Sequence, residues 1–284
     1  MIALRAHKLH TKTQGMVDVA YSVLAEHQPM TLRGVHYQMV SRGVYDNTPS
    51  NYHRLGRAMT KAREAGSIPW PWIVDHLRQT QKPSSWTGLA DFVDTVRDVY
   101  RKDFWTRLPH HVEIFVEKDA MAAALQPATE GYDVALHVAR GYISTSYCHS
   151  VAVQWREIKK PIFAYYLGDW DPSGLDIERD LQAKLERYSG REFEWSRLGV
   201  VPSDFDAFDL LSLAPKASDN RAKAFTAEHG NRCAELDAVP PGELRRRVEE
   251  AIREHIDAEE WGRLQLVEKV EQETITKFMD QLKT

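Results

Sequence analysis

The chain has 284 residues, of which 43% are hydrophobic and only two are cysteine, and its net charge is −4. This length allows one large or two modest domains, and the ordinary composition excludes a disordered chain, a collagen-like repeat and a disulfide scaffold. No apolar run is long enough for a membrane span and the first residues contain no secretory signal, so we expect a cytoplasmic protein with no membrane partner.

The net charge conceals an uneven distribution along the chain. Residues 1–83 hold 11 Lys and Arg against 5 Asp and Glu, a net charge of +6, whereas the remainder holds 26 against 36, a net charge of −10. This asymmetry indicates a module that faces nucleic acid joined to a module of another kind, although an excess of solvated charge is the simpler alternative. Pro, Ser and Gly gather at 81–88, which predicts a connection over 84–110 before a second domain over 111–284.

The spacing of apolar residues predicts three short helices in the basic module, at 15–26, 31–43 and 47–66. With the Pro-interrupted extended segment 68–74, they fit a winged helix-turn-helix domain that binds double-stranded DNA. The third helix would be the recognition helix, and contacts to DNA phosphates would make binding sensitive to salt. Its basic residues are Arg54, Arg57, Lys61 and Arg63.

Tyr37 lies on the second predicted helix, one turn after Arg33. A tyrosine that packs against a neighbouring helix is the ordinary interpretation of this position. The alternative is a nucleophile toward a DNA phosphodiester. A phenol with a pKa of ~10 is a weak nucleophile at neutral pH, so it would need a nearby cation, and Arg33 could supply part of that charge.

From residue 111 the pattern changes to apolar strands that alternate with helices, which predicts a parallel α/β sheet flanked by helices. We expect strands at 111–117, 133–140 and 161–171, and helices at 118–125, 147–158 and 173–188. Glu117, Asp169 and Asp171 fall at strand ends, where ligands bind in such sheets, and oxygen ligands of this kind suit Mg²⁺. Capping of the next helix by Asp171 is the plainer alternative.

The C-terminal region is helical in pattern after Pro240 and Pro241. Val248 and Ile252 lie on one predicted face together with His255 and Ile256, and this face would pack on the sheet or on a dimer partner.

Two motifs resemble those of a Toprim domain: FVEKDA, which contains Glu117, and GDWDPSG, which contains Asp169 and Asp171. The second form resembles the A subunit of topoisomerase VI and the related meiotic double-strand-break transesterase, in which a winged-helix domain precedes the Toprim domain. Segments such as TKAREAGSIPW and LAPKASDNRAKAF make the compact chain similar to the short mini-A relatives from bacteria, phages and mobile elements.

The family's tyrosine motif matches the stretch from Arg33 to Tyr37, but Gly34 and His36 replace its usual acidic and aromatic residues. His36 could hydrogen-bond a phosphate or simply pack. Packing is the more ordinary role.

The resemblance implies a DNA-cleaving transesterase of the topoisomerase (isomerase) class, in which Tyr37 attacks a phosphate that Arg33 stabilises. Glu117, Asp169 and Asp171 would hold Mg²⁺, with Glu117 as a ligand or as the general acid and base. A nucleoid-associated homodimer with shared active sites would cut both strands, and strand passage driven by ATP would need a separate subunit. Two alternatives stay open: a non-catalytic DNA-binding regulator, and a Toprim-type nuclease in which water attacks.

Overall fold

A four-stranded parallel sheet lies at the centre of the computed structural model, which describes residues 11–73, 85–216 and 218–280. The strand order is β2-β1-β3-β4. The strands are β1 (His111–Val116), β2 (Ala135–Val138), β3 (Ile162–Leu167) and β4 (Glu194–Gly199). The predicted parallel α/β sheet is confirmed, and β4 is a strand that the sequence analysis did not identify.

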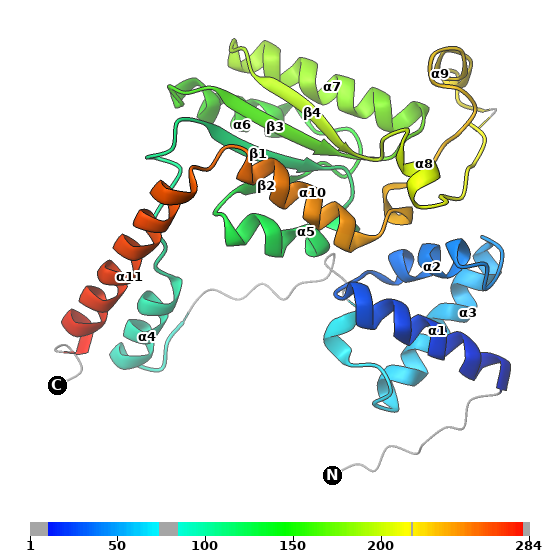
Figure 1. Ribbon diagram of the computed structural model, residues 1–284, viewed down its shortest axis with the longest axis horizontal. Helices are drawn as coiled ribbons and strands as arrows, with labels where there is room; N and C mark the ends of the chain where they lie inside the picture. The colour runs from blue at the N-terminus through cyan, green and yellow to red at the C-terminus, as the bar shows by residue number, and fades with distance from the viewer. Residues whose placement is uncertain (1–10, 74–84, 217, 281–284) are drawn as a thin grey trace.

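Helices cover both faces of the sheet (Figure 1). These helices are α5 (Asp119–Gly131) and α10 (Pro241–Arg253) on one face, and α6 (Thr145–Glu157) and α7 (Pro172–Ser189) on the other. Successive side chains of β1 point to opposite faces, so Ile114 joins the core beneath α5 and α10 while Phe115 packs near Trp155 of α6. Because both faces are covered, β1 is buried apart from its first residue, and β3 contains only aliphatic and aromatic side chains.

The N-terminal module contains α1 (Thr11–His27), α2 (Leu32–Ser41) and α3 (Pro49–Glu64), which share a small core of their own. Thr31 caps α2 by accepting a hydrogen bond from the amide of Gly34, and Thr48 caps α3 in the same way. All three predicted helices are therefore present.

The segment after α3 differs in part from the Pro-interrupted extended stretch that we expected over 68–74. Trp70–Trp72 form a short 3₁₀ helix, η1, and Ile73 then makes a single parallel bridge to Met30. The two prolines fix backbone angles that suit this tight turn. Val74, the last residue of this stretch, and residue 84, the first of the expected connection, lie outside the described residues.

The stretch 84–110 includes α4 (Leu89–Val99), which runs beside the last helix, α11 (Ala258–Asp280), away from the sheet (Figure 1). Tyr100 and Lys102, just after α4, bind Glu271 of α11 at 2.6 and 2.8 Å. The C-terminal region is thus two helices, of which α10 packs against α5 and β4 through Val248 and Ile252. The remaining short elements are α8 (Asp204–Ala207), α9 (Ala222–His229) and η2 (Leu236–Ala238). In the described part of the chain, no helix has the length and hydrophobicity needed to cross a bilayer.

A buried ion pair attaches α10 to the region that follows β4. Asp204 is fully buried, and the two terminal nitrogens of Arg247 donate to its carboxylate at 2.5 and 3.1 Å. Arg247 also donates to the backbone carbonyl of Leu198 at 2.8 Å. The pair therefore fixes the middle of α10 against β4 and the region that follows it.

We predict that Arg247→Leu lowers the free energy of unfolding by about 3 kcal/mol, because it leaves the buried Asp204 carboxylate without its cation. Arg246→Leu is the matched control. Arg246 pairs with Glu243 and Glu250 at the surface, so its replacement leaves the stability nearly unchanged. Urea denaturation of both variants measures the difference, and equal losses would contradict the assignment.

Candidate functional site

The ends of β1 and β3 meet where the sequence predicted neighbouring carboxylates. The two strands pair in parallel, with Val116 opposite Leu167. Glu117 follows β1, and the backbone amide of Asp169 donates to its Oε2 atom at 2.9 Å. Two of the three predicted acids therefore converge at this edge of the sheet.

Close contacts explain the glycines of the GDWDPSG motif. A Cβ atom on Gly168 would lie 2.7 Å from Oε2 of Glu117, and one on Gly174 would lie 2.3 Å from the carbonyl oxygen of Asp169. Gly168 therefore lets the loop pass beside Glu117, and Gly174 lets α7 begin directly against Asp169. Arg197 of β4 fixes the same loop by donating to the carbonyls of Gly168 and Asp169 at 2.7 and 2.6 Å.

One ammonium group joins three carboxylates at this end of the sheet. Nζ of Lys118 lies 2.8 Å from Oδ1 of Asp169, 2.8 Å from Oε2 of Glu235 and 3.0 Å from Oδ2 of Asp237. Burial alone would lower the pKa of Lys118, but Asp237, Asp169 and Glu235 together raise it, so the group stays charged.

Tyr37 reaches the same cluster from α2. Its hydroxyl donates to Oε1 of Glu235 at 2.5 Å, and Nη2 of Arg33 donates to Oε2 of Glu235 at 2.9 Å. Nε2 of Gln38 donates to the carbonyl of Ala238 at 3.3 Å, so α2 docks onto the segment 235–238.

The predicted tyrosine and two of the three predicted strand-end acids, Glu117 and Asp169, thus belong to one connected set of residues, which we call the strand-end network. Its members are Arg33, Tyr37, Glu117, Lys118, Asp169, Glu235 and Asp237.

Two groups of the network have pKa values that matter for proton transfer. Burial, followed by the hydrogen bond to Glu235, raises the pKa of Tyr37 to about 12, whereas Arg33 lowers it. The phenol is therefore protonated at neutral pH in this arrangement. Burial, followed by the charge of Asp169, raises the pKa of Glu117 to about 7, which suits a group that both gives and takes a proton near neutral pH.

The three predicted metal ligands suit Mg²⁺ in their chemistry, because they offer only oxygen atoms. They do not converge on one ion as they lie. Oδ1 of Asp169 binds Lys118, and Oδ1 of Asp171 accepts the amide of Gly174 at 2.7 Å as the N-cap of α7. Within residues 11–73, 85–216 and 218–280, no group of three or more His, Cys, Asp or Glu side chains is placed to hold a metal ion.

The predicted DNA-contacting residues of α3 fall into two groups. Arg54, Arg57 and Lys61 are exposed, and the last two line a shallow pocket beside α2. Arg63 differs, because its guanidinium donates to the carbonyl of Trp70 at 2.8 Å and lies over the Trp70 ring. Three of the four side chains are therefore available to a phosphate backbone, while Arg63 holds η1 in place.

His36 takes the packing role. It is buried, and its ring nitrogens lie 3.2 Å from the hydroxyl of Tyr45 and 3.1 Å from Oδ1 of Asn47. Tyr52 meets the His36 ring edge-on. Tyr45 and Tyr52 therefore surround His36, and it is Tyr37 that contacts the acidic residues.

The sequence analysis did not identify Lys118, Glu235 or Asp237 as site residues. Glu235 and Asp237 are two residues apart, like Asp169 and Asp171, and this spacing was a sign of a site. Because they follow no apolar strand, the sequence offered no reason to place them at the sheet edge. Lys118 directly follows Glu117 and was interpreted only as the start of a helix.

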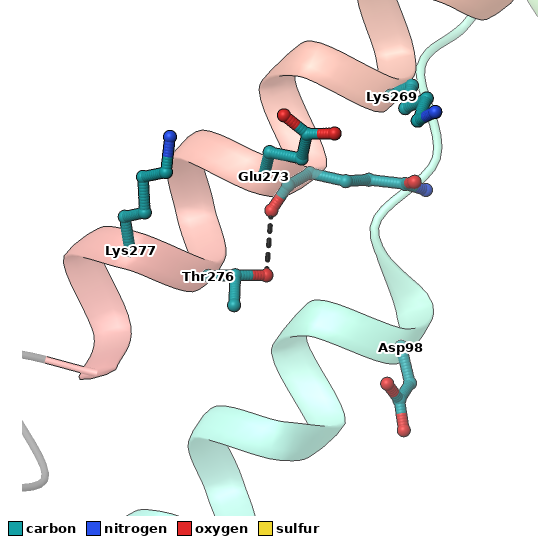
Figure 2. Close-up of a pocket in the computed structure, with 6 residues that line it drawn as sticks. Asp98, Lys269, Glu273, Thr276 and Lys277 are labelled. Carbon is teal, nitrogen blue, oxygen red and sulfur yellow. Dashed lines mark hydrogen bonds between the residues drawn. The ribbon is translucent and has the colours of Figure 1, made fainter.

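A larger hollow lies elsewhere, between α4 and α11 (Figure 2). It is lined by Asp98, Lys269, Gln272, Glu273, Thr276 and Lys277. The hydroxyl of Thr276 donates to the carbonyl of Gln272 at 2.8 Å, and no predicted site residue lines the hollow. We therefore place the candidate site at the strand-end network.

No family model matches the chain, and no curated protein matches it significantly. The functional interpretation accordingly depends on the strand-end network and on the motifs that it contains.

We predict that Glu235→Gln lowers the pKa of Tyr37 from about 12 toward its ordinary value, because the variant removes both the negative charge and the anionic acceptor beside the phenol. The measurement is an absorbance titration of each protein minus that of its Tyr37→Phe derivative. The same subtraction with Tyr45→Phe derivatives is the control, since burial rather than Glu235 raises the pKa of Tyr45 to about 12 and its midpoint should not move. An unchanged Tyr37 midpoint would contradict the hydrogen bond.

Proposed function

We propose that the protein is a DNA-cleaving transesterase similar to the A subunit of topoisomerase VI, with Tyr37 as the nucleophile. One observation carries the proposal. The hydroxyl of Tyr37 contacts Glu235, a carboxylate that shares Lys118 with Asp169, so the candidate nucleophile and the motif acids meet in one site although they are far apart in the sequence. A tyrosine that only packed against a neighbouring helix would not need this contact.

The reaction that we propose is a transesterification at a backbone phosphate. The Tyr37 oxygen forms a bond to phosphorus, the bond from phosphorus to the 3′ oxygen breaks, and the DNA is left joined to the protein through its 5′ phosphate. The phenol proton passes to Glu235, which already accepts it in a hydrogen bond and carries it away as the phosphate takes its place, and Arg33 binds the phosphate. Glu117, with its pKa of about 7, gives a proton to the departing 3′ oxygen and takes it back on religation.

We include Mg²⁺ in the proposal only because Glu117, Asp169 and Asp171 offer the oxygen ligands that this ion prefers. It would neutralise charge on the phosphate, and at Asp169 it would share the carboxylate with Lys118, whose Nζ atom lies 2.8 Å from Oδ1. No step above depends on it.

The proposal extends to the N-terminal module and to the quaternary structure. We propose that α1, α2 and α3 form a winged-helix domain in which Arg54, Arg57 and Lys61 bind the DNA backbone. In the related enzymes the tyrosine of one subunit meets the acidic site of its partner. We propose a homodimer that cuts both strands, and the contact of Tyr37 with Glu235 within one chain supports a site in each protomer rather than a shared one.

A second candidate function is a DNA-binding regulator without catalysis. The observation that favours it is the occupation of Asp169 by Lys118, which places a fixed cation where the motif predicts a metal. Such a protein binds duplex DNA but forms no covalent product.

The test uses supercoiled plasmid with and without Mg²⁺ and ATP, followed by denaturation in detergent. We expect DNA that is covalently linked to the protein, and we expect Tyr37→Phe to reduce this product by at least about a thousandfold, since the nucleophile is lost. Tyr45→Phe is the matched control and retains the product, because Tyr45 contacts His36 rather than the network.

The other outcomes separate the alternatives. Cutting that survives Tyr37→Phe and leaves no adduct indicates a nuclease that uses water. Duplex binding without any cutting indicates the regulator.

A further inference from the structure

We infer that Arg33 and Lys118 together bind the phosphate that reacts, and that in the free protein the carboxylate of Glu235 occupies this position. The inference rests on the proposed function for the identity of the ligand, a phosphodiester of DNA. The site itself is described by contacts that do not depend on catalysis.

The groups around Glu235 are those that bind phosphate oxygens. Its Oε2 atom lies 2.9 Å from Nη2 of Arg33 and 2.8 Å from Nζ of Lys118, and its Oε1 atom accepts the hydroxyl of Tyr37. A guanidinium and an ammonium that converge on one anionic oxygen form charge-assisted hydrogen bonds, which phosphate accepts as readily as carboxylate does. An oxygen that took the place of Oε2 would lie beside the Tyr37 hydroxyl, which is where the attacked phosphate must be.

Of the three carboxylates on Lys118, Glu235 is the one that can leave. The Asp237 side chain is completely buried, and Oδ1 of Asp169 is held by the amide of Leu236 at 2.8 Å. The Glu235 side chain keeps 24% of its surface exposed, and Arg33 keeps 53%, so solvent and a DNA strand can reach both.

Backbone hydrogen bonds restrict this movement to the side chain of Glu235. The neighbouring Ala234 exchanges two backbone hydrogen bonds with Trp170, at 2.9 and 3.0 Å, and Leu236 is tied to Asp169 on the other side. Rotation of the side chain alone can therefore release Arg33 and Lys118 without disturbing the loop that carries Asp169.

The charges show why the displacement matters for binding. Arg33 and Lys118 pair with three carboxylates, which gives the joined groups a net charge of −1. A phosphate therefore meets net repulsion while Glu235 is in place, and meets two cationic donors in a set of groups with no net charge after Glu235 moves away. DNA that α3 also holds can supply the binding free energy for this exchange, whereas a free phosphate cannot. Glu235 thus keeps free phosphate out of the reactive position and gives way only to DNA that α3 also binds.

The experiment measures the affinity of the full chain for a short duplex, without Mg²⁺ and in a Tyr37→Phe background so that no cleavage interferes. We expect Glu235→Gln to tighten binding by about tenfold, because it removes the competing carboxylate and its charge. Glu26→Gln is the matched control, because it also removes one negative charge that pairs with an arginine of the N-terminal module, in this case Arg42. We expect this surface change to alter the affinity by less than about twofold.

A second variant shows whether the gain arises at the reactive position. Adding Arg33→Gln to Glu235→Gln should cancel the gain, and Arg33 is exposed enough for its replacement to leave folding intact. The inference is overturned if Glu235→Gln binds no tighter than Glu26→Gln, or if the gain persists without Arg33. Because the assay involves no cleavage, its result is independent of whether Tyr37 forms adducts, and a failure of the proposed function would be seen only in the plasmid experiment.

Discussion

One half-buried ammonium, that of Lys118, holds together the carboxylates at the end of the sheet. Carboxylates that crowd together in a poorly hydrated site repel one another strongly, and each loses hydration as well. Lys118 binds Asp169, Glu235 and Asp237 at 2.8 to 3.0 Å and so neutralises much of this repulsion. Three features depend on Lys118: the position of the loop after β3 that carries Asp169, the position of the segment before α10, and the contact of that segment with α2.

The segment 234–238 connects the end of the sheet to the N-terminal module through hydrogen bonds. Ala234 and Leu236 hydrogen-bond the loop after β3, while Glu235 and Ala238 accept hydrogen bonds from α2. A helix of the basic module is thereby held against the acidic sheet edge. The uneven charge along the chain therefore has a structural counterpart, since the two oppositely charged parts meet at Tyr37.

Local patterns predicted most of the helices and strands and four of the seven residues of the strand-end network. Glu117 and Asp169 could be placed together because parallel neighbouring strands end at the same edge of a sheet. Strand β4 was missed because most of its side chains are exposed or half-buried, so it lacks the continuous apolar run of β1 and β3. The partners of Lys118 could not be predicted, because it meets Glu235 across 117 residues and no local periodicity reports such a contact.

The central claim is that Tyr37 becomes joined to DNA in the strand-end network. The most direct measurement is mass spectrometry of the protein after reaction with duplex DNA, denaturation, and digestion of both components. The account predicts a peptide whose Tyr37 carries a nucleotide through a 5′ phosphate. A nucleotide on any other residue, or cleaved DNA with no modified peptide, would contradict it.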